Sequence, residues 1–176
     1  MLSLPTRTIS RIELSDTSSS ETLTVDTSGL PFTARHLFLR LNLLGSGSVD
    51  LELRINTDSS SIYHRNYLSG ASSSTSAAKY IDQDSFVFST LDATLWTNEE
   101  YLFPDALSTR SHKSVLRLAG TGENKVEVSS GRWGSTDAIS SLVVFPTSGT
   151  MAAGSVLELA VVDEMYAIPG IETILA

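Results

Sequence analysis

The imidazole of histidine can serve both as a general base and as a metal ligand. Each of the three histidines stands beside a basic residue. The pairs are His36 with Arg35, His64 with Arg65, and His112 with Lys113. An adjacent cation disfavours a catalytic imidazolium and a bound divalent metal alike, and the spacing matches no zinc motif. We therefore interpret the histidines as ordinary strand or surface positions and expect neither a metal nor a cofactor.

The hydroxyl and carboxyl groups indicate no clearer reaction. No serine stands in a Gly-x-Ser-x-Gly turn before a helix, so a nucleophilic serine is not indicated. Residues 56–58 and 82–84 could supply oxygen ligands to calcium, but neither matches the twelve-residue calcium loop. Close pairs of carboxylates could serve a glycosidase if the fold set them at the right separation. The pairs are Asp82 with Asp84, Glu99 with Glu100, and Asp163 with Glu164. We interpret them as solvated turn residues and expect no enzymatic activity.

A glycine-rich segment and a set of aromatic residues could bind ligands. Residues 120–125 (GTGENK) resemble a phosphate loop, but they lack its Gly-Lys-Ser/Thr ending and have strand patterns on both sides, which favours a hairpin. The aromatic residues could line a sugar-binding surface, and the alternative is packing in or beside the core. They are Trp96, Trp133, Tyr63, Tyr67 and Tyr101.

Composition limits the classes of partner. The chain has 176 residues, no cysteine and a formal net charge of −8. A chain of this length can form one domain with a single core. The acidic balance and the scattered basic residues argue against nucleic acid as a partner, because phosphate binding needs clustered Lys and Arg. No apolar run approaches the ~20 residues of a membrane helix, so we expect no membrane partner.

Alternation of apolar and polar residues predicts the elements that carry these groups. The two clearest strands are residues 36–44 and 49–55. At a period of two, the first places Leu37, Leu39, Leu41 and Leu43 on one face and Phe38 and Leu44 on the other, and the second places Val49, Leu51, Leu53 and Ile55 on one face. Gly45–Ser48 between them predicts a hairpin loop. Residues 69–78 (SGASSSTSAA) are low in complexity and predict a long flexible loop. Residues 91–98 could add one or two helical turns.

Short strands recur along the rest of the chain, at residues 8–14, 21–26, 86–88, 100–103, 114–118, 125–129, 139–145 and 156–162. About ten strands with Gly/Ser turns predict an all-β fold, an antiparallel β-sandwich of jelly-roll type. We place the sandwich at residues 21–164. Residues 1–20 and 165–176 are then expected to be extended N- and C-terminal arms that lie outside it.

Residues 132–162 resemble a pattern that recurs in virion proteins of tailed bacteriophages. In that pattern a Trp, a few small polar residues and Ala-Ile precede a strand that ends in Pro. A Ser-Gly connection that closes on Gly-Ser then leads to a last apolar strand. The matching residues here are Trp133, Ala138, Ile139, Pro146, residues 148–155 (SGTMAAGS) and residues 156–161.

The resemblance extends upstream to about residue 22. Residues 51–58 followed by Tyr63 and Tyr67 are similar to a strand ending in Asn-Gly-Asp before a Tyr, with Thr57 in place of the Gly. Residues 30–37 are similar to the Ile-Pro segment that leads into the first long strand. Residues 113–116 match a Tyr-Lys-Ser segment, with His112 where Tyr is usual.

This resemblance implies a jelly-roll or β-sandwich component of a phage particle. We expect a non-enzymatic capsid cement or decoration protein, assembled in the host cytoplasm and located on the outer head surface of the virion. Its expected partners are the major capsid protein and further copies of itself in a homotrimer, with the arms reaching adjacent subunits. The alternatives are a tail or fibre module that binds host-surface glycans and, third, a polysaccharide depolymerase.

Association of an acidic chain with itself gains nothing from charge, so we expect apolar subunit contacts. The candidate interface residues fall on faces that the strand patterns do not assign to the core, or at a sheet edge. They are Phe38, Leu44, Trp96, Phe103 and Trp133.

Overall fold

The computed structural model describes residues 6–30, 34–71, 74–121 and 125–163. Twelve strands make up the described part of the chain, which contains no helix and therefore none that could cross a membrane. The strands are β1 (Thr6–Glu13), β2 (Glu21–Thr24), β3 (Ala34–Leu43), β4 (Val49–Ile55), β5 (Tyr63–Ala71), β6 (Ser74–Gln83), β7 (Phe86–Leu91), β8 (Thr97–Phe103), β9 (Lys113–Thr121), β10 (Lys125–Trp133), β11 (Ser141–Pro146) and β12 (Val156–Asp163).

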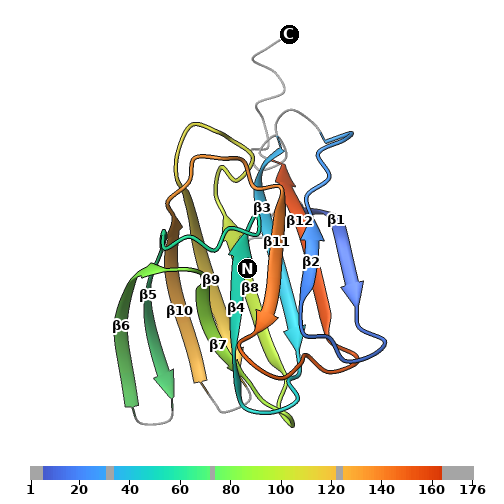
Figure 1. The fold of residues 1–176 in the computed structure, drawn as a ribbon, viewed down its shortest axis with the longest axis vertical. Coiled ribbons are helices and arrows are strands. Elements are labelled where there is room, and N and C mark those ends of the chain that lie inside the picture. Colours follow the sequence, from blue (N-terminus) through green and yellow to red (C-terminus); the bar gives the residue numbers. More distant parts are fainter. Residues whose placement is uncertain (1–5, 31–33, 72–73, 122–124, 164–176) are drawn as a thin grey trace, which may run out of the picture.

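The strands form two antiparallel sheets that pack face to face (Figure 1). The large sheet has the order β1-β12-β3-β8-β9-β10-β5-β6, and the small sheet has the order β2-β11-β4-β7. The chain crosses between the sheets at most of its connections. The predicted all-β antiparallel sandwich is therefore confirmed, whereas its jelly-roll type stays a prediction.

The core lies between the two sheets and is filled by the alternate residues of their strands. In β3 the four leucines Leu37, Leu39, Leu41 and Leu43 are buried, as their spacing predicts. Leu51, Leu53 and Ile55 of β4 face them from the small sheet. Each such side chain contributes about 1.5–3 kcal/mol on burial, so these strands supply a large part of the stabilisation of the fold.

The expected N-terminal arm is wrong for residues 6–13, because these residues form β1. Thr6–Glu13 pairs with Glu158 and its neighbours in β12 along nearly the whole strand. Leu14 is buried in the core, and Ile9 and Ile12 pack against it. The reason is that β12 would otherwise present an unpaired edge. The expected C-terminal arm, residues 165–176, lies outside the described residues.

Two loop predictions are also wrong. Gly45–Ser48 joins β3 of the large sheet to β4 of the small one, so it is a crossing between sheets and not a hairpin. Most of the predicted flexible loop at residues 69–78 belongs to β5 and β6, which pair as a hairpin. This hairpin needs no apolar alternation, because its strands are held by backbone hydrogen bonds to each other and, through β5, to β10.

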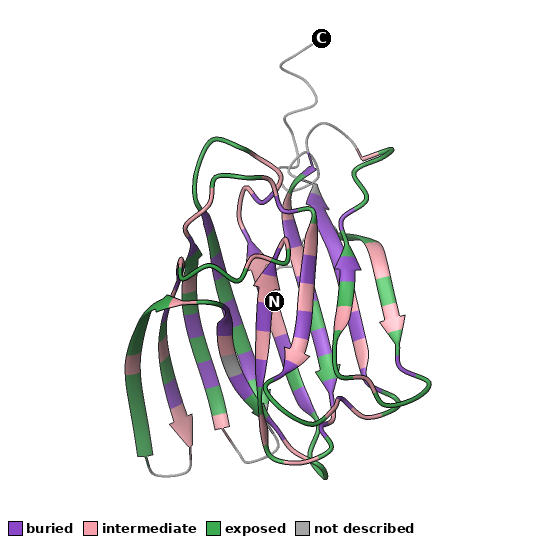
Figure 2. Ribbon diagram, viewed as in Figure 1, coloured by how far each residue is buried: buried purple, intermediate pink, exposed green. Residues whose placement is uncertain are grey.

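The unequal sheets leave the β5–β6 end of the large sheet extending beyond the small sheet (Figure 2). Every residue of β6 is exposed except Ala78 and Gln83, which are half-buried. This overhang exposes both faces of β6 and creates the hollow described below.

Candidate functional site

Three ionised side chains lie together inside the sandwich where the leucine core ends. Arg117 of β9 lies between Glu99 of β8 and Glu127 of β10, and all three point to the inner face of the large sheet. The Arg117 Nε is 2.8 Å from a Glu99 carboxylate oxygen, and its Nη1 is 2.5 Å from one of Glu127. The Arg117 and Glu99 side chains are fully buried. The interpretation of Glu99 as a solvated turn residue is therefore wrong.

Hydrogen bonds from neighbouring strands complete this network. Ser89 of β7 and the hydroxyl of Tyr101 both donate to Glu99, and Lys125 Nζ lies 3.1 Å from Glu127. Burial raises the pKa of Glu99, but the charge of Arg117 and the donated hydrogen bonds outweigh it, so the pKa of this carboxyl lies below its ordinary value. Glu99 therefore stays ionised and paired, and its side chain is shielded from solvent.

A cavity of about 270 Å³ opens beside this network, between edge strand β7 and the overhanging hairpin. Its walls are mainly polar and aromatic. Arg65 lies over the rings of Tyr80 and Tyr67, with its guanidinium carbon 4.5 and 5.3 Å from the ring centres. Burial lowers the pKa of Arg65. Asp50, Gln83 and Thr90 also line the cavity.

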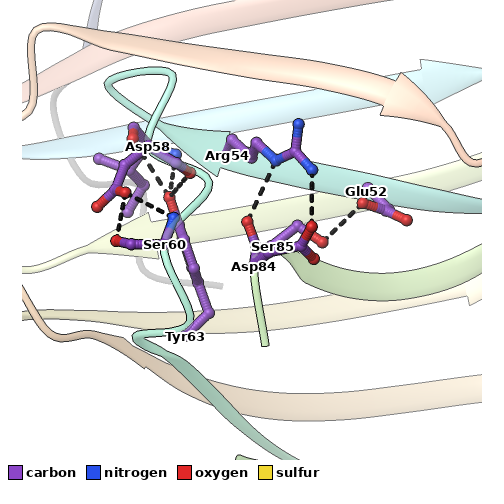
Figure 3. A network of polar contacts seen from close by, with 8 residues as sticks. Glu52, Arg54, Asp58, Ser60, Tyr63, Asp84 and Ser85 are labelled. Carbon is purple, nitrogen blue, oxygen red and sulfur yellow. Dashed lines mark hydrogen bonds and ion pairs between the residues drawn. The ribbon is translucent and has the colours of Figure 1, made fainter. Parts of the chain in front are cut away.

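A second polar network lies around the β4–β5 turn (Figure 3). The Tyr63 hydroxyl donates to the Asp58 carbonyl oxygen at 2.9 Å and accepts a bond from the Ile55 amide at 3.0 Å. Trp133 Nε1 donates to the Asp58 carboxylate at 2.8 Å. Burial raises the pKa of Asp58, but the hydrogen bonds from Ser60 and Trp133 lower it by more. The pKa of this carboxyl therefore lies below its ordinary value. These bonds fix the turn and its aromatic residues in place.

The same figure shows how β4 is joined to the residues that lead into β7, its neighbour in the small sheet. Arg54 of β4 pairs with Asp84 at 3.1 Å, and Ser85 donates to Glu52 at 2.7 Å. All of these side chains are engaged with one another, so this network is structural.

The structure does not bring the predicted interface residues together on one surface. Phe103 and Trp133 are wrong as interface residues, because both are buried in the core, at 0% and 2% exposure. Phe103 pairs in register with Leu37 and so shares its inward face. Phe38 and Leu44 are half-buried, and Trp96 is 41% exposed in the β7–β8 connection. Of the predicted sugar-binding aromatics, Tyr63 and Tyr101 are also buried.

A group of exposed apolar side chains lies elsewhere, on the outer face of the large sheet. We name it the apolar face. It consists of five side chains that are each 49% to 59% exposed, namely Leu68, Leu116, Leu118, Val126 and Val128. In β9 and β10 the usual alternation is inverted, because the charged Arg117 and Glu127 point inward while their apolar neighbours point to solvent.

Strand register arranges the apolar face in rows. Leu118, Val128 and Leu68 are directly paired across β9, β10 and β5. In the next row, Gly120 and Gly70 pair with Val126 on its two sides. A methyl group placed on either glycine would meet no atom within 4 Å. The apolar face therefore has a ridge of three large side chains, Leu118, Val128 and Leu68. Beside this ridge lies a row in which two glycines flank a single valine.

Sequence reasoning placed Val126 and Val128 on one face but missed that this face is exposed. The signal was present in part, since oppositely charged Arg117 and Glu127 occupy the alternate positions of two neighbouring strands. Periodicity tells which residues share a face, but not which face is turned inward.

No protein-family model matches the chain, and no curated protein matches it in sequence. The resemblance to tailed-phage virion proteins therefore stays a prediction. Within the described part of the chain, no group of three or more His, Asp or Glu side chains is placed to hold a metal ion.

Proposed function

We propose that this protein is a non-enzymatic structural protein that acts by binding other protein surfaces. The observation that carries the proposal is the apolar face. Five half-exposed apolar side chains on neighbouring strands of one sheet face are unusual for a chain that works alone, because such patches mark contact sites or promote aggregation. A sheet face also offers a rigid surface that requires little ordering on binding.

The assembly that we propose is a bacteriophage particle, on the strength of the resemblance in residues 22–162. In it the protein acts as head cement, bound to the major capsid protein on the outer capsid surface after assembly in the host cytoplasm. Protein that binds only the assembled shell stabilises that shell by mass action. Many copies strengthen individually weak contacts.

The interior chemistry supports a structural role. The buried carboxylates Glu99 and Glu127 are both paired with Arg117, and Glu99 is held ionised by its partners. A catalytic acid or base needs access to a substrate and a pKa near the working pH. This network offers neither at Glu99.

The test is to image gold-labelled antibody to the chain on particles of the phage that encodes it. We expect label on heads, and particles that lack the protein should release their DNA at a lower temperature than complete ones. Added wild-type protein should restore the release temperature, whereas an unrelated acidic protein should not. Particles that contain no copies would contradict the proposal.

A specific observation favours a second candidate, the tail or fibre module that binds glycans. The cavity beside β7 brings Tyr67 and Tyr80 next to Arg65, Asp50 and Gln83, a combination of rings with hydrogen-bonding groups that suits a sugar. Label confined to tails would favour this candidate. Binding to host-surface glycans that is lost in Tyr80→Ala and kept in Trp96→Ala would support it further.

A further inference from the structure

We infer that the cavity between β7 and the β5–β6 hairpin binds a sugar unit that carries a carboxylate, such as a uronic acid. The inference rests on the second candidate function, because it takes the ligand to be a sugar, and it adds the charge by which that sugar is recognised. It is independent of the cement role, which uses the apolar face on the other side of the large sheet.

The cavity exists because the large sheet extends beyond the small one. In the part of the chain that the structure describes, β7 pairs with β4 alone, and its other edge borders the cavity. The facing wall is the inward side of β5, β6 and β10, which supply Arg65, Tyr80 and Lys125. The volume of about 270 Å³ lies just below the ~300–1,000 Å³ of pockets that take drug-sized ligands. The space therefore suits a single small ring.

One carboxylate in the wall of the cavity is shared by three cations. Glu127 lies 2.5 Å from Arg117 and 3.1 Å from Lys125. Burial lowers the pKa of Arg65, and the charge of Glu127 partly offsets this shift, so Arg65 also lies within the field of this carboxylate. Glu99 supplies a second negative charge, paired with Arg117. Among these five side chains the cations therefore exceed the carboxylates by one charge.

Asp50 is a further carboxylate that lines the cavity, but it lies in a different environment. It is exposed, and Thr90 donates a hydrogen bond to it at 3.1 Å. Water screens the charge of an exposed group much more than that of a buried one, so Asp50 offsets the interior charge only weakly. A carboxylate on the ligand would balance the excess positive charge of the buried groups.

Arg65 is held in place for such a group. Its residue is 8% exposed, and its guanidinium carbon lies 4.5 Å from the ring centre of Tyr80 and 5.3 Å from that of Tyr67. Ring contacts use the flat face of a guanidinium, whereas its N–H groups lie along the edge and can bind a carboxylate in pairs. Because the two rings already restrain Arg65, little side-chain freedom is lost when a ligand binds.

The rest of the lining suits the hydroxyl groups and the ring of a sugar. Gln83, Ser85 and Thr90 bring amide and hydroxyl groups, which both donate and accept hydrogen bonds. Tyr80 is 40% exposed, so part of its ring can contact the ligand. A simple carboxylate such as acetate would engage Arg65 but few of these groups. The lining as a whole therefore favours a carboxylate that is attached to a sugar ring.

The experiment is an NMR titration of the full chain with sodium glucuronate, glucose and sodium acetate, followed through the ring signals of Tyr67 and Tyr80. Glucuronate and glucose differ in one group, which is a carboxylate in the first and a hydroxymethyl group in the second. We expect glucuronate to bind in the millimolar range and both other probes to bind at least about tenfold more weakly. Raising the NaCl concentration from about 0.05 to about 0.5 M should weaken glucuronate binding severalfold, because salt screens the attraction.

Two variants change the charge of the cavity in opposite directions. Arg65→Met should weaken glucuronate binding at least about tenfold. Its control is Arg40→Met, which removes an exposed arginine that lies over the ring of Phe38 and should leave binding unchanged. Asp50→Asn should strengthen binding by about twofold to fivefold, because it removes a repelling carboxylate. Asp16→Asn gives the same net charge from a site between β1 and β2 and should have no effect. A gain of binding cannot arise from a loss of folding, so Asp50→Asn remains decisive if Arg65→Met unfolds.

The outcomes distinguish this inference from the functions proposed above. Equal binding of glucuronate and glucose overturns the inference and leaves the second candidate function standing. Acetate that binds as tightly as glucuronate overturns it too, because the sugar ring then contributes nothing. Glucuronate binding that is unchanged in folded Arg65→Met and in Asp50→Asn lies elsewhere and overturns it as well. No binding of any probe overturns the inference without affecting the cement role. Selective binding of glucuronate together with label on heads supports the inference and rejects the tail location.

Discussion

Arg117 is the residue around which the polar half of the interior is arranged. It is fully buried and bonds to two carboxylates on the strands on either side of it. Such a network gives little net stability compared with an apolar core of the same shape, because three ionised groups lose their hydration. We expect its effect to lie in specificity, since the pairing favours one alignment of β8, β9 and β10 over others.

Removal of the central charge should therefore be much more harmful than removal of a surface charge. We expect Arg117→Met to lower the free energy of unfolding by about 3–5 kcal/mol, because it leaves Glu99 buried without its cation and takes from Glu127 one of the cations beside it. Arg40→Met breaks the exposed pair with Glu100 and should cost less than about 1 kcal/mol. Urea denaturation of both variants measures the difference. Equal effects would show that the network is open to water.

The lowered pKa of Glu99 gives stability a defined pH dependence. A carboxyl whose folded pKa lies below its unfolded value stabilises the fold above the unfolded value, and this stabilisation is lost as pH falls through the folded pKa. We therefore expect the unfolding temperature to fall as pH is lowered from the ordinary value of 4.5. In Glu99→Gln the curve should be lower at neutral pH and flatter below pH 4.5. An unchanged slope below that pH would contradict the assignment.

Gly131 tests the packing between the sheets. A methyl group on this residue of β10 would lie 2.6 Å from a ring carbon of Phe86 and 2.9 Å from a methyl of Val115. Gly131→Ala should therefore destabilise the fold by about 1–3 kcal/mol through overpacking. Gly120→Ala on β9 enters open space and should be neutral or stabilising by up to about 1 kcal/mol. Thermal unfolding of the two variants provides the comparison.

At the scale of elements, β1 and the β5–β6 hairpin close the two edges of the large sheet in different ways. β1 covers β12 and packs Ile9 and Ile12 against the core, whereas β6 is exposed nearly throughout. Removal of an edge strand lowers the stability of the fold strongly only where it uncovers apolar residues. The two edges of the large sheet should therefore differ in how much stability is lost when their outer strand is removed.

We expect deletion of residues 1–13 to destabilise the domain, because it uncovers the edge of β12 and the apolar side chains beside it. The deletion should lower the midpoint of urea unfolding and increase aggregation. Deletion of residues 1–5 alone is the control and should leave the midpoint nearly unchanged, since it leaves β1 intact. A folded and equally stable chain without residues 1–13 would restore the interpretation of this segment as an arm.

At the scale of the whole molecule, the apolar face and the acidic balance oppose each other. The charge of −8 keeps molecules apart at neutral pH, while the five exposed side chains favour their association. Solubility therefore depends on how much of the charge remains.

We expect solubility to be lowest near the calculated isoelectric point of 4.7, where repulsion vanishes and the apolar face remains exposed. Light scattering against pH should show a maximum there. The maximum should be smaller in Val128→Asp and unchanged in Leu95→Asp at matched net charge. Equal maxima in the two variants would show that the apolar face does not drive the association.

Sequence alone determined the fold class and much of the core. Period-two leucines in residues 37–43 and the apolar residues of 51–55 define strands with one buried face, and the structure confirms both. Turn residues and the absence of helical periodicity were sufficient to predict two packed antiparallel sheets. These signals are local, since they depend on residues within a few positions of one another.

Only the tertiary structure decided which strands lie beside each other and which face is turned inward. The crossing at Gly45–Ser48, the pairing of β1 with β12 and the β5–β6 hairpin all depend on partners far away in the chain. The face of β9 and β10 could not be predicted, because either set of alternate residues could point inward. Placing Arg117 between Glu99 and Glu127 satisfies three charges at once, and this long-range pairing turns the valines and leucines of those strands toward solvent.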